Sequence, residues 1–157
     1  MVTLTPITER EFDDFLTLSI PRYAEENVRA GYWNAAEALE KSRSDHAKLL
    51  PQGVATKNHF LFNIISDEGG KKIGTIWLAS KPGESTTPTG FIFDLFIDEN
   101  YRRKGYATQA MRAIEQKAAE FGLRKLNLHV FAHNSAAQAL YDKLGYATTS
   151  LNMGKDL

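Results

Sequence analysis

The sequence contains no cysteine. This absence excludes disulfide bonds, a catalytic thiolate and cysteine-ligated zinc sites. The chain also has no excess of charge of either sign, since Lys and Arg together number 19 and so do Asp and Glu. A balanced charge argues against general binding to nucleic acids or membrane surfaces, although it is compatible with a local cationic patch.

No targeting segment is expected either. The first residues, MVTLTPITEREFDDF, contain neither a basic region nor an apolar run, so they do not resemble a signal peptide. No apolar stretch approaches the length that is needed to cross a membrane. We therefore expect a cytoplasmic protein that has no nucleic-acid or membrane partner.

The residues that are present are typical of a globular protein. The chain has 157 residues, of which 43% are hydrophobic and 24% are charged. This length and composition are sufficient to bury a core. No internal repeat, low-complexity tract or linker divides the chain, so we expect one domain over residues 1–157.

The first third of the chain predicts one strand followed by helices. Residues 2–7, VTLTPI, alternate like a short strand. Thr8 and Glu11 have the spacing of a capping box, which starts a helix. Pro21 is expected to break or kink that helix, because proline lacks an N–H donor. The helices predicted here cover residues 8–20, 22–31 and 34–50.

The rest of the chain alternates between strand and helix patterns. The predicted strands cover residues 59–66, 71–80, 91–97 and 125–131, with one or two more from Tyr146 onward. The predicted helices cover residues 105–121 and 135–144. This order indicates an α/β (α+β) domain around one central sheet.

The stretch FIFDLFIDENYRRKGYATQAM, residues 91–111, joins an apolar strand to a helix through a cationic turn. The first amides of a helix have no partner within the helix, and the helix dipole adds partial positive charge there. Gly105 and Ala107 would let an anion approach the backbone closely, so the turn predicts an anion site. A solvated cationic turn beside a packed helix explains the same residues.

Two motifs resemble the GNAT (Gcn5-related N-acetyltransferase) superfamily. Arg102–Ala107, RRKGYA, is similar to its central motif, Arg/Gln-x-x-Gly-x-Gly/Ala, although the family often has a small residue at Arg103 and glycine at Ala107. LNLHVFAHNSAAQALYDKLGY, residues 126–146, is similar to a later motif with an Asn, a Tyr and K-x-G-[FY]. The two motifs cover about the C-terminal third of the chain, and the resemblance is to a bacterial member of the superfamily.

The resemblance implies a mixed, mostly antiparallel and twisted sheet flanked by helices. This sheet would be splayed between the strands Phe91–Ile97 and Lys125–Phe131. It also implies acetyl-coenzyme A as co-substrate, with its pyrophosphate on the amides of the turn and its pantetheine arm along the strand that ends at Ile97. Asn134 would bond the pantetheine, cap the following helix, or do both. The implied coenzyme-binding residues are Phe96, Ile97, Arg102, Arg103, Lys104, Gly105, Tyr106, Ala107, Thr108 and Asn134.

Acetyl transfer to an amine needs a neutral amine, donors for the carbonyl oxygen and an acid for the leaving thiolate. The resemblance places that acid at Tyr141, whose phenol has an ordinary pKa of about 10. A core tyrosine on a short helix would have the same spacing.

Two residues are candidates for the general base. His129 alternates with Leu128 and Val130 on the predicted strand, so it points to the other face. Asp94 is a lone carboxylate inside FIFDLFI, which is costly unless it is partnered or faces a wet cleft. A chain of waters is a third route for the proton. A metal held by His129 and His133 is not expected, and His133 reads as a solvated loop residue.

The acceptor region is expected near the first helices. Glu25 and Glu26 could receive a cationic amine, and Tyr32 and Trp33 could wall its carbon chain. A solvated acidic helix face and two core aromatics explain the same residues.

The predicted function is acetyl transfer to a primary amine of a small molecule or peptide. The alternatives are a coenzyme A-binding module without turnover, and acyl transfer to oxygen or with a longer chain. Both a monomer and a homodimer are compatible with the sequence.

Overall fold

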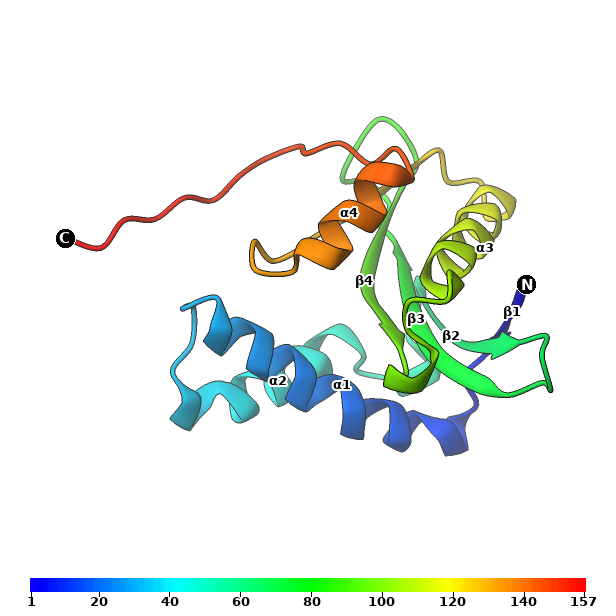
Figure 1. The fold of residues 1–157 in the computed structure, drawn as a ribbon, viewed down its shortest axis with the longest axis horizontal. Helices are drawn as coiled ribbons and strands as arrows, with labels where there is room; N and C mark the ends of the chain where they lie inside the picture. Colours follow the sequence, from blue (N-terminus) through cyan, green and yellow to red (C-terminus); the bar gives the residue numbers. More distant parts are fainter.

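The computed structural model describes residues 1–157 and contains one five-stranded sheet (Figure 1). Its strands lie in chain order: β1 (Val2–Pro6), β2 (His59–Ser66), β3 (Lys72–Ser80), β4 (Thr89–Ile97) and β5 (Lys125–Leu128). Strands β1 to β4 pair antiparallel, and β5 pairs parallel to β4. This mixed, mostly antiparallel sheet confirms the predicted fold class.

Helices cover both faces of the sheet (Figure 1). Helices α1 (Glu9–Arg29) and α2 (Ala35–Leu49) lie on one side, and α3 (Tyr106–Glu120) and α4 (Ser135–Lys143) lie on the other. Two single turns, η1 (Gly53–Ala55) and η2 (Glu99–Tyr101), complete the elements.

Each face has its own apolar cluster. The cluster under α1 contains Ile7, Phe15, Leu50, Leu61 and Trp77. The larger cluster under α3 contains Phe62, Ile64, Ile73, Ile76, Leu78, Ile92, Ile97, Tyr106, Ala110, Met111, Ile114 and Ala118. Full burial of one large apolar side chain stabilises a fold by about 1.5–3 kcal/mol, so these two clusters hold the sheet between its helices.

Strand β5 leaves β4 after four paired residues. The pairing runs from Thr89 with Lys125 to Ile92 with Leu128 and then stops. Residues 93–97 of β4 therefore have no strand beside them on this side, which confirms the predicted splay. The prediction that the strand continues to Phe131 is wrong, because the chain turns away after Leu128 toward the end of α1.

Strand β4 also contains a bulge at Phe93. Trp77 of β3 is opposite Asp94, whereas the next residue, Leu78, is opposite Ile92. The extra residue changes which side chains face each layer. Phe93 packs in the α1 cluster and Asp94 pairs with an α1 side chain, whereas Leu95 packs against the α3 cluster.

Helix α1 runs through Pro21, so the predicted division into two helices at this proline is wrong. The proline is exposed, and the carbonyl that loses its helical donor, that of Thr17, lies on the same solvent-facing side. Water can bond to that carbonyl. The buried side chains on both sides of Pro21, which are Phe15, Ser19, Ala24 and Asn27, keep the helix packed against the sheet and α2.

The predicted strand after Tyr146 is also wrong. The last residues form no regular structure, and the tail extends away from the body of the protein (Figure 1). Leu151 and Met153 are 76% and 92% exposed, so they find no apolar surface to pair with in this chain. No helix has the length and apolar content that a membrane span requires.

Candidate active site

The turn from η2 into α3 leaves a set of backbone amides without partners. Gly105 precedes the helix with φ of 81° and no side-chain cap, and Arg103 also has a positive φ, of 60°. The other three helices have N-terminal side-chain partners: Glu11 at α1, Asn34 at α2 and Asn134 at α4. The amides of Tyr106 to Thr108 therefore remain free for an outside acceptor.

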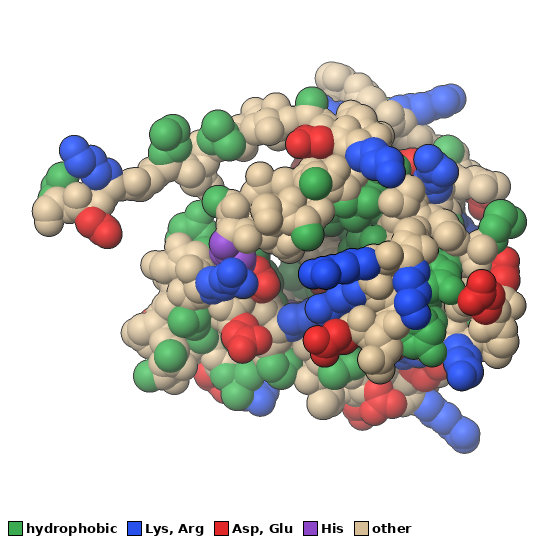
Figure 2. Space-filling view, in the orientation of Figure 1, with side chains coloured by type: hydrophobic (Ala, Val, Ile, Leu, Met, Phe, Trp, Pro, Cys, Tyr) green, Lys and Arg blue, Asp and Glu red, His purple; other side chains and the backbone are tan.

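Cationic side chains surround this turn. Arg102 donates from Nε to the Ile97 carbonyl oxygen at 2.8 Å, and its guanidinium lies 5.7 Å from the centre of the Phe96 ring. Arg103 and Lys104 are exposed. Figure 2 shows Lys and Arg side chains gathered beside the hollow between α1 and α4. The helix dipole and these charges act in the same direction, so the turn favours an anion.

The Arg102 bond also marks the end of the open strand edge. Asp98 donates its amide to the Ile73 carbonyl on the β3 side. The backbone N–H and C=O groups of a strand alternate between its two edges, so those of Leu95 and Ile97 point toward the gap between β4 and β5. One carbonyl at this edge, that of Ile97, already accepts the Arg102 hydrogen bond.

Asp94 lies in the same gap and has a partner from α1. Arg22 Nη2 is 2.5 Å from Asp94 Oδ2, and the two side chains are 26% and 22% exposed. Burial raises the pKa of Asp94 above its ordinary value, while the charges of Arg22 and His46 oppose that rise. The carboxylate is therefore partnered and still reaches solvent.

Tyr141 of α4 approaches the gap from the opposite layer. Burial, together with the nearby charge of Asp94, raises the pKa of Tyr141 to about 12. Its ring contacts that of Tyr146 at 5.8 Å. The Tyr146 hydroxyl donates to Glu115 Oε1 at 3.0 Å, whereas the Tyr141 hydroxyl makes no such bond. Tyr141 thus remains a protonated phenol with its donor free.

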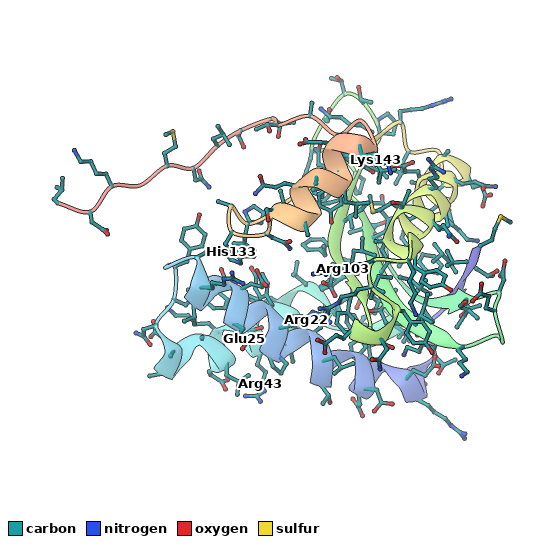
Figure 3. The ribbon with its side chains drawn as sticks, in the orientation of Figure 1. Arg22, Glu25, Arg43, Arg103, His133 and Lys143 are labelled. Carbon is teal, nitrogen blue, oxygen red and sulfur yellow. The ribbon has the colours of Figure 1, made fainter.

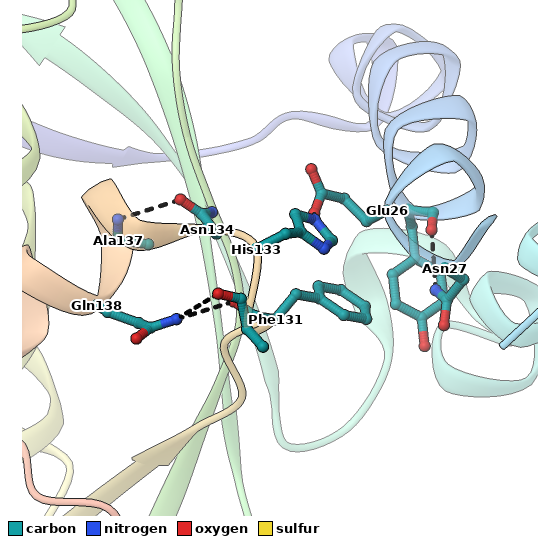
Figure 4. Close-up of polar contacts among 9 residues, drawn as sticks. Glu26, Asn27, Phe131, His133, Asn134, Ala137 and Gln138 are labelled. Atoms are coloured by element: carbon teal, nitrogen blue, oxygen red, sulfur yellow. Dashed lines mark hydrogen bonds and ion pairs between the residues drawn. The ribbon is translucent and has the colours of Figure 1, made fainter. Parts of the chain in front are cut away.

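The segment after β5 crosses to α1 and closes one end of the gap. His133 Nε2 is 2.5 Å from Glu26 Oε2, and its ring stacks on Phe131 at 5.4 Å (Figure 4). The His133 side chain is 18% exposed, so its interpretation as a solvated loop residue is wrong. The pair joins two segments that are 107 positions apart in the sequence.

His129 does not lie on a strand, contrary to the prediction from the sequence. It lies beyond the end of β5, is exposed, and touches Phe131 with a ring separation of 4.8 Å. The strand alternation that was expected to orient it does not extend that far. No group of three or more His, Asp or Glu residues in the chain is arranged to hold a metal ion.

Asn134 caps α4. Its Oδ1 accepts a hydrogen bond from the Ala137 amide at 3.1 Å, and Gln138 holds the preceding loop through the carbonyls of Phe131 and Ala132 (Figure 4). The side-chain NH₂ of Asn134 is not used by the cap, so the cap leaves a donor available at the gap.

The acceptor-region residues lie at the same end of α1. Glu25 is exposed, and Tyr32 is 57% exposed with its ring 6.4 Å from Phe131. Trp33 is half-buried and packs edge-on against Tyr23 at 5.5 Å. Tyr32 therefore faces solvent near the gap, whereas Trp33 packs within the helical layer.

The structure brings Asp94, Tyr141 and the cationic turn together around one gap and leaves His129 at its margin. Arg22 was missed by the sequence analysis, because nothing in its local sequence marks it as the partner of a residue 72 positions away. Figure 3 shows the side chains of Arg22 and Arg103 between α1 and α4, with Glu25 farther along α1 and His133 in the loop before α4.

Known proteins resemble this chain along its whole length. The sequence model of the acetyltransferase (GNAT) family matches residues 20–146. The uncharacterized N-acetyltransferases YdgE and YycN of Bacillus subtilis (strain 168) are 38% and 40% identical. The YdgE match covers 99% of this chain and 98% of YdgE, and the YycN match covers 99% of both chains. The crystal structure of YycN superposes with a TM-score of 0.94 over 100% of this chain and 99% of YycN.

Proposed function

The chain belongs to the acetyltransferase (GNAT) family and is an N-acetyltransferase, and from this membership we propose that it moves the acetyl group of acetyl-coenzyme A directly to a primary amine. The observation that carries the proposal is the uncapped N-terminus of α3 at the end of the gap between β4 and β5. This feature supplies free amides beside a cationic patch at the mouth of the gap.

The hydrogen-bonding groups and charges around the gap match those of the coenzyme. A diphosphate has several acceptor oxygens and negative charge, which match the amides from Arg103 to Thr108 and the side chains of Arg103 and Lys104. The backbone of Leu95 and Ile97 on the open edge of β4 would pair with the amides of the pantetheine arm. The NH₂ of Asn134 would donate from the other side of the gap.

The coenzyme supplies an acetyl thioester, and the protein supplies the proton transfers. Tyr141 would protonate the sulfur as it leaves, which its free hydroxyl and raised pKa support because the phenol stays protonated at neutral pH. We propose Asp94 as the base that takes a proton from the acceptor, in preference to His129. Asp94 is half-buried and paired with Arg22, and burial raises its pKa, which makes it a stronger base than an ordinary carboxylate, whereas His129 is exposed beyond β5.

The acceptor would be the amine of a small molecule or a peptide that enters from the C-terminal end of α1. Glu25 offers a carboxylate there, and Tyr32 and Phe131 offer aromatic faces. A carboxylate and an aromatic face both attract an ammonium group.

A thiol-release assay tests this function. Each reaction would contain the protein, acetyl-coenzyme A and one amine. The amines are propylamine, spermidine, an aminoglycoside and a short peptide with a free N-terminus. We expect release of free thiol with at least one amine. Tyr141→Phe should lower turnover by about 10²-fold or more, because general acid catalysis contributes at least that much, while the dissociation constant for acetyl-coenzyme A stays within about twofold.

Tyr146→Phe is the matched control, because it removes a hydroxyl from the neighbouring ring that is already bonded to Glu115. It should keep most of the turnover. Binding of acetyl-coenzyme A without thiol release from any amine would instead support the alternative of a non-catalytic binding module.

A further inference from the structure

Arg22 of α1 is fixed by two contacts in the gap. Its Nη2 is 2.5 Å from Asp94 Oδ2, and its guanidinium lies 4.0 Å from the centre of the Phe96 ring, close enough for a cation–π contact. Arg102 lies over the same ring at 5.7 Å. Both guanidinium groups therefore lie near the Phe96 ring, and one is paired with the Asp94 carboxylate while the other bonds the Ile97 carbonyl.

The pairing with Arg22 leaves the Asp94 carboxylate able to accept a hydrogen bond or a proton from another group. A carboxylate has two oxygens and about four lone-pair sites, of which Arg22 uses one on Oδ2 and the nearby Leu95 amide can use another. The Asp94 side chain is also 22% exposed. A pair that served only to join α1 to β4 would not need to keep this access.

Charged and titratable groups reach Asp94 from three helices. Arg22 comes from α1, His46 from α2 and Tyr141 from α4. His46 is buried, with Nδ1 donating to the Ser42 carbonyl oxygen and Nε2 near the Ser19 hydroxyl. Arg22 is the one group of the three that carries a fixed positive charge in contact with the carboxylate.

We propose that Arg22 is a positioning residue, which keeps Asp94 ionised and turned to the gap so that Asp94 can take a proton from the acceptor amine. The proposal rests on the proposed function. Asp94 accepts one proton from the ammonium of the acceptor, and the nitrogen lone pair that is freed forms a bond to the acetyl carbon as the bond from carbon to sulfur breaks. Tyr141 gives its proton to the sulfur, and the second proton of the amine replaces it through water. Asp94 then returns its proton to solvent.

Titration of the Asp94 side chain tests the proposal without an acceptor. The carboxyl carbon would be followed by ¹³C NMR against pH, with Asp94→Asn to assign the signal. An adjacent arginine lowers the pKa of a carboxyl by roughly 1–3 units. In Arg22→Met the titration midpoint should therefore rise by about one unit or more, whereas Arg22→Lys, which keeps the charge, should recover most of the wild-type value.

Arg43→Met is the matched control. Arg43 is also paired with a carboxylate, at 2.9 Å from Glu40, but it lies on α2 away from the gap (Figure 3). This substitution removes an arginine of the same kind and should leave the Asp94 midpoint unchanged. If circular dichroism shows that Arg22→Met does not fold, Arg22→Gln takes its place with the same expected shift.

Turnover separates failure of this inference from failure of the proposed function. With the amine that releases most thiol, the acidic limb of the kcat profile should move to higher pH in Arg22→Met and return in Arg22→Lys. Hydroxylamine is neutral at pH 7, so as an acceptor it does not need to be deprotonated before it attacks. With hydroxylamine, Arg22→Met should therefore lose much less of the wild-type turnover. No thiol release by wild type with any amine overturns the proposed function. Release by wild type with the same Asp94 midpoint and acidic limb in Arg22→Met overturns the role of Arg22 alone.

Discussion

Asp94 lies on the α1 side of the sheet because β4 contains one extra residue at Phe93. Simple alternation from Ile92 would have placed Asp94 in the α3 layer with Ile92. A lone carboxylate in this strand was expected to need a partner or a wet cleft, and the structure supplies the partner, Arg22, and leaves the Asp94 side chain 22% exposed. Neither the bulge nor Arg22 leaves a local pattern, so neither could be found from the sequence.

The second residue that the sequence did not explain is His133. Its pairing with Glu26 depends on how the segment after β5 meets the end of α1. Glu26 was predicted to lie near the acceptor and His133 in a loop, but no local pattern relates two positions that are 107 residues apart. By contrast, Asn134 precedes a helix that carries Tyr141, as their motif predicts, because that motif is local.

Asn134 is expected to have two separable roles. Asn134→Asp keeps an acceptor for the Ala137 amide and should leave thermal stability nearly unchanged. It removes the NH₂ donor, so affinity for acetyl-coenzyme A should fall by roughly 2–10-fold, the value of one neutral hydrogen bond. Asn134→Ala should additionally lower the unfolding free energy by about 1 kcal/mol. Calorimetric binding and urea titrations measure the two effects, and unchanged affinity in both variants would leave Asn134 as a cap only.

The raised pKa of Tyr141 predicts a loss of stability in base. The folded pKa is about 12 and the ordinary value is 10.0, so above pH 10 the unfolded chain releases this proton first. The unfolding free energy should therefore be fully maintained below pH 10 and fall as the pH rises toward 12, by on the order of 2 kcal/mol. Urea titrations of wild type and Tyr141→Phe test this, and Tyr141→Phe should show the smaller fall. Equal falls in the two proteins would contradict the raised pKa.

At the scale of elements, prediction was accurate where local pattern and tertiary packing agree. The strands at 59–66 and 91–97 and the helix from the cationic turn were located to within about two residues of the observed elements. The failures occurred where packing overrides the local signal. Helix α1 continues through Pro21 because its buried face is held on both sides, and β5 ends early because the chain leaves for α1.

Replacement of Pro21 should stabilise the protein. Alanine restores a donor to the Thr17 carbonyl and is about 3 kcal/mol better than proline inside a helix, while the unfolded chain gains about 1 kcal/mol of conformational freedom. Pro21→Ala should therefore raise the unfolding free energy by about 1–2 kcal/mol in urea titrations. Pro51→Ala is the control, since Pro51 follows the end of α2 and interrupts no helix. A loss of stability in Pro21→Ala would mean that the proline fits a bend that the helix requires.

At the scale of the whole molecule, a chain with no net charge places Arg102, Arg103 and Lys104 together where one helix start lacks a cap. The composition alone could not show this, because a patch depends on how the turn and α1 come together. The fold class was predictable, since the order of strands and helices and the two motifs both indicate it. The assembly of the gap from β4, α1, α3 and α4 required the structure.

The central claim is that the start of α3 holds acetyl-coenzyme A, and calorimetric titration with the coenzyme tests it most directly. Gly105→Glu places bulk and negative charge at the turn. Gly122→Glu is the matched control, because Gly122 follows the other end of α3 with φ of 83°, close to the 81° of Gly105, and neither site has an atom within 4 Å of an added Cβ. Both variants therefore carry similar backbone strain.

The account predicts that wild type and Gly122→Glu bind acetyl-coenzyme A and that Gly105→Glu, still folded by circular dichroism, binds at least about 10-fold more weakly, a change of about 1.4 kcal/mol. Equal binding by all three proteins would show that the coenzyme lies elsewhere. No binding by wild type would contradict the account as a whole.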